Sequence, residues 1–198
     1  SDILSEHGTS AARKTFVSQD EWDEMHRCAD AVMAHAFVKG EGLFSDGVGE
    51  RSFFADVTYN DPGIYGRKWP MKARPDWLQA TRVTDVKSWK GGAGRSAFIA
   101  QANRLHYDLS AALYLDVLRE HGHRSDVFTW VVVDKSTLKT GGRVIIHAIT
   151  MSPAFIEQGR DKLSDALDRI HSWETSPGIY NRQEEIEHIA EPPAWGWR

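Results

Sequence analysis

The chain has 198 residues, 41% of them hydrophobic, which suits one globular domain with a buried core. Its formal net charge of −4 argues against a protein that coats nucleic acid through overall positive charge, but leaves room for a local basic track. A single cysteine, Cys28, excludes a disulfide framework and favours a reducing, cytoplasmic compartment. The sequence contains no apolar run of about 18 residues or more, so we expect no membrane span.

We expect residues 1–17 to be poorly ordered and residues 18–198 to form a single domain. The N-terminal segment has neither the basic region nor the apolar region of a secretory signal. The rest of the chain shows no internal repeat, low-complexity segment or linker that would divide it.

The first predicted element is a helix from Ser18 to about Lys39. Ser18 and Glu21 have the spacing of a capping box, and apolar residues recur at helical spacing along the segment. Three β segments are expected next, at 50–58, 71–78 and 82–88. A turn over 78–81 is expected to join the last two segments as a hairpin.

The second half of the chain is expected to contain two further strands and two helices. The helices are predicted at 96–121 and 152–173, and the strands at 128–133 and 143–150. The continuous apolar run over 128–133 is typical of a central strand covered on both faces. The order of elements predicts an α/β or α+β sandwich, in which helices flank a central mixed sheet of about five strands.

Acidic residues and one lysine fall on the three predicted β segments of the first half. Glu50 begins the first segment, Asp76 lies near the end of the second, and the third carries Asp85 and Lys87. Because side chains alternate along a strand, Asp85 and Lys87 are expected on one face, with Val86 pointing into the core on the other. The hairpin would let Asp76 approach Asp85 near its mouth.

Carboxylates held this close repel one another unless a cation compensates their charge. Mg²⁺ prefers oxygen ligands and keeps waters on the substrate side, and Mn²⁺ is a substitute with the same preference. Such a site suits phosphodiester hydrolysis, with Lys87 holding the attacking water or stabilising the developing charge. Pro75-Asp76 and Asp85-Val86-Lys87 form a PD-(D/E)xK signature, but as a bare pattern a solvated surface hairpin explains it equally well.

A longer set of residues resembles one family. The matching segments are Gly49-Glu50-Arg51-Ser52, Lys72 to Trp77, Asp85 to Ser88, and a helix with Tyr107, Ala111, Ala112 and Tyr114. In order and spacing they resemble the RecE (exonuclease VIII)-like PD-(D/E)xK nucleases, over about residues 21–195. The resemblance implies a restriction-endonuclease-like core and a Mg²⁺-dependent 5′→3′ exonuclease acting on double-stranded DNA in phage-type recombination. It also implies a ring-like homo-oligomer and a partner protein that anneals single strands.

The same resemblance implies roles for individual residues. Asp76 and Asp85 would be metal ligands and Lys87 the catalytic lysine, with Glu50 as an accessory acid near the metal. Tyr107 and Tyr114 would shape the helix that faces the scissile phosphate, although core packing explains both equally well. The chain departs from the family in two places. Ser110 stands where the family has a Gln that helps to place substrate or water. The role of the family's metal-ligating His is not carried over, because His7-Gly8-Thr9 has the wrong order, so either the helix that bears it lies outside this chain or this branch does without it.

Several basic residues near the predicted site are candidates for DNA contact. The set is Arg74, Trp89, Lys90, Arg95 and Arg104. Basic residues interleaved with an aromatic suit backbone contact and base stacking, whereas a plain solvated helix face is the alternative. Arg74 either pairs with Asp76 or contacts a phosphate. Two alternative functions stay open: an endonuclease or structure-specific nuclease on the same core, and an inactive DNA-binding or assembly subunit.

Overall fold

The computed structural model describes residues 17–59, 66–92 and 94–175. The expected disorder over residues 1–16 and the His7 segment lie outside the described residues. The helices are α1 (Gln19–Ala34), α2 (Ala36–Gly40), α3 (Gly94–Arg104), α4 (Tyr107–Glu120), α5 (Pro153–Thr175) and the 3₁₀ turn η1 (Leu138–Thr140). The strands are β1 (Val48–Gly49), β2 (Phe53–Thr58), β3 (Lys68–Ala73), β4 (Trp77–Leu78), β5 (Arg82–Trp89), β6 (Val127–Asp134) and β7 (Ile145–Thr150).

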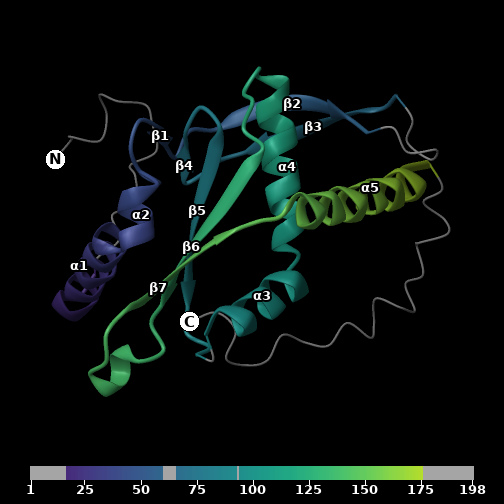
Figure 1. The fold of residues 1–198 in the computed structure, drawn as a ribbon. Coiled ribbons are helices and arrows are strands. Elements are labelled where there is room, and N and C mark those ends of the chain that lie inside the picture. Colours follow the sequence, from purple (N-terminus) through teal and green to yellow (C-terminus); the bar gives the residue numbers. More distant parts are fainter. Residues whose placement is uncertain (1–16, 60–65, 93, 176–198) are drawn as a thin grey trace, which may run out of the picture.

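The main sheet has five strands in the order β1-β4-β5-β6-β7. Strands β5 and β6 run parallel, while β4 pairs antiparallel with β5 and β7 antiparallel with β6. Figure 1 shows α1 and α2 on one side of this sheet and α3, α4 and α5 on the other. The predicted mixed sheet flanked by helices is therefore confirmed. Within the described residues, no helix is long and apolar enough to cross a bilayer.

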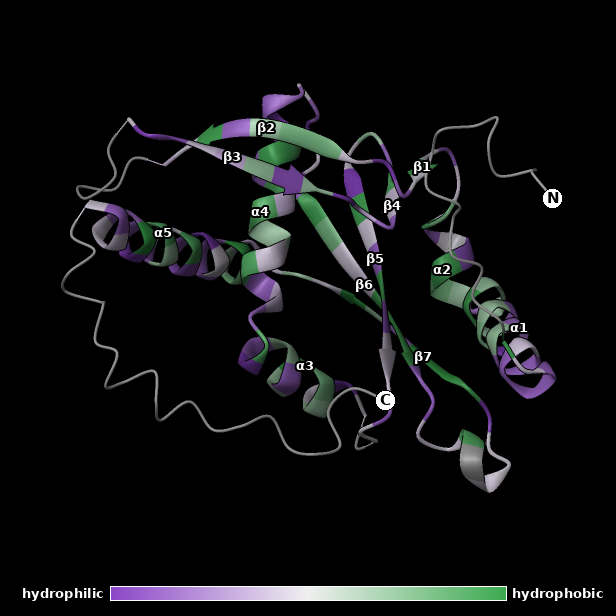
Figure 2. Cartoon of the chain, turned by 180° about the vertical axis from the view of Figure 1, so that it is seen from behind, coloured by the Kyte–Doolittle hydropathy of each residue, from purple (hydrophilic) through white to green (hydrophobic). Residues whose placement is uncertain are grey.

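Strand β6 lies at the centre of the core, as its apolar run predicts. Phe128, Trp130 and Val132 belong to the large hydrophobic cluster that includes α4 and α5. Val131 and Val133 point the other way, into a smaller cluster with residues of α1 and α2. Because both faces of the strand are covered, almost every residue in it is buried. Figure 2 shows α5 with alternating hydrophilic and hydrophobic bands, as expected of a helix with one face on this core.

The predicted helix over 96–121 is wrong, because the chain breaks into α3 and α4. His106 adopts a left-handed conformation with φ of 54°, which a helix interior does not tolerate. The break redirects the chain, so that α4 crosses the sheet while α3 stays near its lower end (Figure 1). The first helix is also shorter than predicted. It ends at Ala34, and His35 is extended before the short α2 begins.

The first two predicted β segments are also arranged differently from the prediction. Segment 50–58 does not join the main sheet, because β2 pairs with β3 as a separate two-stranded sheet that packs on α4. Segment 71–78 splits into β3 and β4, separated by Arg74, Pro75 and Asp76. Pro75 has no backbone N–H to donate, so a strand ladder does not continue through it. The split leaves Asp76 in a connection beside β5.

The helices α4 and α5 approach each other closely at Gly159. A Cβ at this buried position would collide with the backbone carbonyl of Asp108. Glycine is therefore required here by space and not by backbone conformation. Two buried aspartates of α4, Asp108 and Asp116, pair with Lys162 and Arg160 of α5 across the same interface. The interface fixes α4, and with it the helix face that is turned toward β5.

Candidate functional site

Strand β5 carries the first two residues of the candidate site. Asp85 lies opposite Trp130 and Lys87 opposite Val132 in the parallel register with β6. Both side chains point to the face covered by α4, where they line one cavity, which confirms the prediction from strand alternation. Val86 points to the other face as predicted, but it is 38% exposed. The prediction that it lies in the core is wrong, because a cavity separates it from α1.

Asp76 joins these two residues through the β4–β5 pairing. Trp77 lies opposite Thr84 in the antiparallel register, so the preceding Asp76 lies beside the middle of β5. Its Oδ2 accepts a hydrogen bond of 2.7 Å from the backbone N–H of Val86. The predicted approach of Asp76 to Asp85 is therefore observed. This backbone hydrogen bond fixes the position of the Asp76 carboxylate without neutralising its charge.

Asp85 is a buried carboxylate with few hydrogen-bond donors around it. The residue is 6% exposed, and no backbone N–H or uncharged side chain among the described residues donates a hydrogen bond to its buried Oδ2. Its charged neighbour is Lys87, whose Nζ lies 2.6 Å from that oxygen. Burial raises the pKa of Asp85, the charge of Asp76 raises it further, and Lys87 opposes the change. The protein thus holds a negative charge where more positive charge would be favourable.

Helix α4 closes a cavity of about 100 Å³ over this pair. It is lined by Asp85, Lys87, Tyr107, Ser110, Tyr114, Phe128 and Trp130. Lys87 Nζ lies 5.2 Å from the centre of the Tyr107 ring, a cation–π contact that holds the ammonium toward the cavity. Burial raises the pKa of Tyr114, and the nearby Asp85 charge adds to the rise. The three α4 residues expected at the site therefore do lie together around it.

Glu50 and Arg74 are placed differently from the prediction. The Glu50 carboxylate is largely exposed and lies 2.6 Å from Arg74 Nη2, so Arg74 pairs with Glu50 and not with Asp76. The backbone ties Glu50 to the site region, because its N–H donates to the Asp76 carbonyl at 3.2 Å. Its φ of 55° is unusual for a residue other than glycine and turns the chain toward the separate β2–β3 sheet. The structure therefore does not bring the Glu50 side chain to the other two carboxylates.

The charged residues that remain at the site are the carboxylates of Asp76 and Asp85 and the ammonium of Lys87. In the part of the chain that the structure describes, no group of three or more His, Cys, Asp or Glu side chains is placed to hold a metal ion. Mg²⁺ is commonly bound by one or two carboxylates together with waters and substrate phosphate. Two carboxylates, one of them buried and short of hydrogen bonds, fit that requirement. The residues therefore suit a cation whose coordination the substrate completes.

Two of the residues predicted to contact DNA lie at the far end of β5. Trp89 is partly buried, its indole N–H donates to the Gly92 carbonyl at 3.2 Å, and its ring packs against Phe98 at 5.8 Å. Trp89 thus contributes to packing, which leaves less of its ring available for stacking on a base. Lys90 is exposed and lines a polar cavity together with Glu24 and Lys135, which form an ion pair of 2.9 Å.

The two predicted DNA-contacting arginines of α3 differ from each other. Arg104 is exposed, and its guanidinium is hydrogen-bonded to Gln101 one turn earlier in the helix. Arg95 is exposed at the start of the helix and lines a cavity of about 210 Å³ that also touches Trp130. Because Trp130 also lines the cavity over Asp85 and Lys87, Arg95 is connected to the candidate site.

Sequence reasoning missed Phe128 and Trp130 as residues that line the site. Both were assigned only to a buried central strand, and both are indeed almost fully buried. The signal that identifies them is the parallel register, which places Trp130 directly beside Asp85. That register depends on strand pairing in three dimensions, so the apolar run alone does not reveal it.

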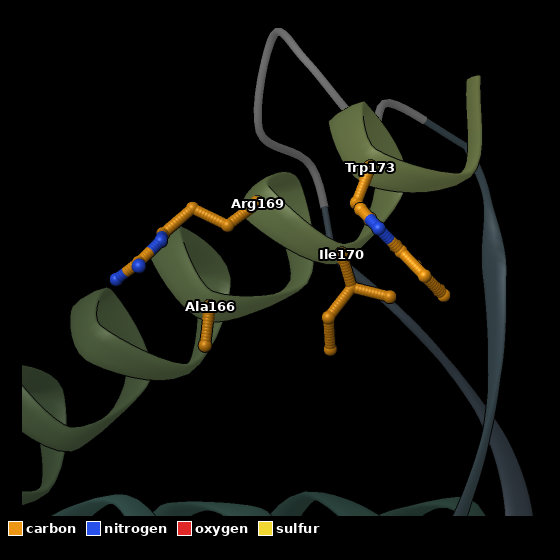
Figure 3. A pocket seen from close by; sticks show the side chains of 4 residues that line it. All are labelled: Ala166, Arg169, Ile170 and Trp173. Atoms are coloured by element: carbon orange, nitrogen blue, oxygen red, sulfur yellow. The ribbon is translucent and has the colours of Figure 1, made fainter. Parts of the chain in front are cut away.

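Two larger cavities lie elsewhere and carry no carboxylate in their described linings. One, of about 350 Å³, is formed by Ala166, Arg169, Ile170 and Trp173, which project from α5 (Figure 3). The other, of about 360 Å³, is an apolar space between α1 and the sheet, lined by Cys28 from α1 and Val86 from β5 among others. Cavity size therefore does not identify the reactive site, whereas the paired carboxylates and the lysine do.

Comparison with known families identifies the class of this domain. Residues 5–190 match the family described as a PDDEXK-like domain of unknown function (DUF3799). Since the match spans nearly the whole chain, the chain belongs to this PDDEXK-like family. The name of the family refers to the same acidic and lysine pattern that Asp76, Asp85 and Lys87 present on β5 and beside it. A search of curated proteins gave no match.

A solved structure shares the fold of this chain. A crystal structure from Eubacterium rectale named "Putative exonuclease" is 14% identical, with a TM-score of 0.56 over 80% of this chain. This chain spans 55% of that protein's length. A second structure, SSO0001, is 13% identical, and the match covers 74% of this chain and 58% of the SSO0001 chain. Its TM-score of 0.37 is too low to show a common fold. At this identity the first likeness shows a common fold and leaves activity to be argued from the site.

Proposed function

We propose that this chain is a metal-dependent deoxyribonuclease that hydrolyses phosphodiester bonds. The observation that carries the proposal is the buried Oδ2 of Asp85. Among the described residues its one polar partner is Lys87, whose Nζ lies 2.6 Å away, and the pair stands in a PDDEXK-like domain. Asp76 supplies a second carboxylate beside the same strand. A carboxylate pair with one ammonium, at the edge of a small cavity, meets the requirements of metal-assisted hydrolysis.

Asp76 and Asp85 would hold the cation, which we propose to be Mg²⁺ with Mn²⁺ as a substitute. When bound, the cation polarises the scissile phosphate and lowers the pKa of a water bound to it. Lys87 is placed to hold the attacking water or to stabilise the charge that develops on phosphorus oxygens. Tyr107 fixes the ammonium from the opposite side of the cavity. Burial by α4 limits competing water, which strengthens these interactions.

The finer assignment is a 5′→3′ exonuclease acting on double-stranded DNA in phage-type recombination. It is supported by the resemblance to the RecE-like nucleases in the residues around Asp76, Asp85 and Tyr107. The fold shared with the Eubacterium rectale protein is consistent with it. We also propose a cytoplasmic location, assembly as a homo-oligomer and a partner that anneals single strands. The location rests on the single cysteine, whereas the homo-oligomer and the annealing partner rest on the resemblance.

Ser110 gives a reason to keep endonuclease activity as the second candidate function. Its side chain lines the cavity over Asp85 and Lys87, at the position where the resembled family has a Gln. A serine hydroxyl reaches less far than a glutamine amide, so it is less able to contact the end of a DNA strand and hold it in place. The substrate preference can differ while the metal-binding residues stay the same.

The test uses linear and circular duplex DNA with Mg²⁺ or Mn²⁺, and linear substrates labelled at the 5′ or the 3′ end. The parent chain is compared with Lys87→Ala and with Lys39→Ala, an exposed lysine at the end of α2, as a matched control. We expect the parent and Lys39→Ala to degrade linear duplex progressively from its 5′ end, and Lys87→Ala to be inactive. Cleavage of the circle identifies the endonuclease instead. Intact DNA with the parent under all of these conditions contradicts the nuclease proposal.

A further inference from the structure

A second cavity adjoins the candidate site and has a different chemistry. It measures about 210 Å³ and lies between the start of α3, the end of β7 and the start of α5. Its lining residues are Arg95, Ile99, Trp130, Ile149, Thr150, Met151, Ser152 and Phe155. Trp130 also lines the cavity over Asp85 and Lys87, so one side chain separates the two cavities.

A row of aromatic rings connects the two cavities. Lys87 Nζ lies 5.2 Å from the Tyr107 ring centre, and the Tyr107 and Trp130 ring centres are 6.1 Å apart. Trp130 then meets Phe155 edge-to-face at 5.9 Å between ring centres. Such contacts fix the rings relative to one another, so the second cavity is held at a defined distance from Lys87.

The lining combines apolar walls with one arginine. Ile99, Ile149 and Phe155 present apolar surface, whereas Arg95 makes no hydrogen bond or ion pair with any other described residue. A guanidinium stacks on planar rings and also binds phosphate oxygens through parallel N–H donors. A purely apolar ligand would leave Arg95 without a partner, and a bare phosphate would leave the walls in contact with water. A ligand with a flat apolar part and an attached anion satisfies both.

Two hydroxyl groups add polar contacts at the rim of the cavity. The Thr150 and Thr129 hydroxyl oxygens lie 3.1 Å apart and share a hydrogen bond. Ser152 Oγ accepts the backbone N–H of Phe155 at 3.3 Å, which leaves its own hydroxyl hydrogen free to donate outward. The cavity therefore offers a few directed polar groups around an apolar interior, as small-molecule sites do.

We propose that this cavity binds the nucleoside unit next to the scissile phosphate, with the base on the apolar walls and Arg95 on the adjoining phosphate. The inference rests on the proposed function, because the cavity is defined by its position beside the Asp85–Lys87 site. Recognition by apolar walls and one guanidinium does not distinguish the four bases, so the subsite is tolerant of sequence. By binding this unit, the cavity orients the DNA strand so that the phosphodiester bond to be cut lies next to Lys87.

The test separates binding from cleavage. All binding measurements use the Lys87→Ala chain in EDTA, with a short fluorescently labelled single-stranded oligonucleotide followed by anisotropy. Arg95→Ala is added to this background, and Arg169→Ala serves as the matched control, since Arg169 projects from the far part of α5 (Figure 3). We expect Arg95→Ala to weaken binding about tenfold and Arg169→Ala to leave it unchanged.

A second variant tests the apolar wall without removing a charge. Ile99→Trp places a large ring in the cavity, and we expect it to weaken oligonucleotide binding about as much as Arg95→Ala does. Thermal unfolding checks that each variant remains folded. In the active chain, Arg95→Ala is expected to raise KM about tenfold with little change in kcat, because it removes a contact made equally in the ground and transition states.

The outcomes distinguish this inference from the proposed function. DNA cleavage by the parent, together with Arg95→Ala and Ile99→Trp chains that bind and cut like the Arg169→Ala control, overturns the subsite and leaves the nuclease intact. Arg95-dependent binding in a parent that cuts no DNA supports the subsite and overturns the nuclease. Absence of both overturns both. Equal weakening by Arg95→Ala and Arg169→Ala reveals general charge attraction and also overturns the subsite.

Discussion

Two buried aspartates, Asp85 and Asp108, each lie against a lysine, yet their surroundings differ. Asp108 accepts hydrogen bonds from Lys162 at 2.5 Å, from Gln158 at 2.8 Å and from the Leu109 N–H at 3.0 Å. Burial pushes the pKa of Asp108 up, but these hydrogen bonds outweigh it and leave the pKa below its ordinary value. Asp85 has its lysine at 2.6 Å and a raised pKa.

The difference separates a structural carboxylate from a candidate site carboxylate. At the α4–α5 interface the fold surrounds the charge of Asp108 with donors, so the ionised form is stabilised there. On β5 the fold buries Asp85, keeps Asp76 nearby and gives the Asp85 Oδ2 only the Lys87 ammonium as a partner among the described residues. Carboxylates with a pKa raised by burial and by a neighbouring carboxylate are typical of functional sites, where stability is sacrificed for chemistry.

The largest effect in this comparison is expected from Lys162→Met, which leaves the Asp108 charge buried without its cation. Breaking a buried ion pair in this way costs about 3–5 kcal/mol in the free energy of unfolding, measured by urea denaturation. Because the folded pKa of Asp108 is lowered, its contribution is complete above the ordinary aspartate pKa and is lost as pH falls through the folded pKa. The difference between parent and variant should therefore shrink in acid. Lys68→Met, at an exposed lysine of β3, is the control, and an equal loss there would refute the interpretation.

Asp76→Asn is expected to have the next largest effect, and on activity more than on stability. The asparagine amide oxygen still accepts the N–H of Val86, so the connection to β5 is kept. The loss of one negative charge weakens the cation site, and we expect DNA cleavage to fall about 100-fold or more. Steady-state cleavage assays measure the loss, and circular dichroism confirms the fold. Activity close to that of the parent would exclude Asp76 from the cation site.

Asp85→Asn is expected to stabilise the protein while it abolishes cleavage. A carboxyl whose folded pKa is raised makes the native state less stable as pH rises from the ordinary aspartate pKa through the folded value. Replacing it by a neutral amide removes this penalty, and we expect a gain of roughly 0.5–2 kcal/mol at neutral pH. The gain should vanish toward low pH, where Asp85 is protonated in both states. Thermal unfolding across pH tests this, and a neutral-pH loss of stability would show that Asp85 is a structural carboxylate like Asp108.

Glu50→Gln is expected to have the smallest effect. Its carboxylate pairs with Arg74 on the surface, and such pairs contribute about 0.2–1 kcal/mol. We expect DNA cleavage to stay close to that of the parent, because the structure keeps this side chain away from Asp76 and Asp85. A large loss of cleavage would instead support the sequence prediction that Glu50 is an accessory acid at the metal.

The local part of the site could be predicted from the sequence. Alternation along β5 places Asp85 and Lys87 on one face, and the turn before Arg82 implies the hairpin that brings Asp76 close. These relations depend only on neighbouring residues and on the period of a strand. The sheet of about five strands follows in the same way from the order of the elements.

The remaining features depend on tertiary structure and left no local signal. Apolar periodicity runs on through His106, because α3 and α4 pack on the same core, so the break between them is hidden. The Glu50 carboxylate pairs with Arg74 on the surface, and this contact depends on how the chain folds in three dimensions. Asp108 and Asp116 have the spacing of a solvated helix face, and only the approach of α5 buries them.

The most direct test of the central claim is the thermal unfolding midpoint of the parent chain and of Asp85→Asn, measured with and without Mn²⁺. A ligand that binds only the native state raises the midpoint, because it stabilises that state by RT ln(1 + L/Kd), where L is the free ligand concentration. We predict that saturating Mn²⁺ raises the midpoint of the parent and leaves that of Asp85→Asn unchanged, with Glu50→Gln responding like the parent. An equal rise in the parent and in Asp85→Asn, or no rise in the parent, would contradict a cation site at Asp85.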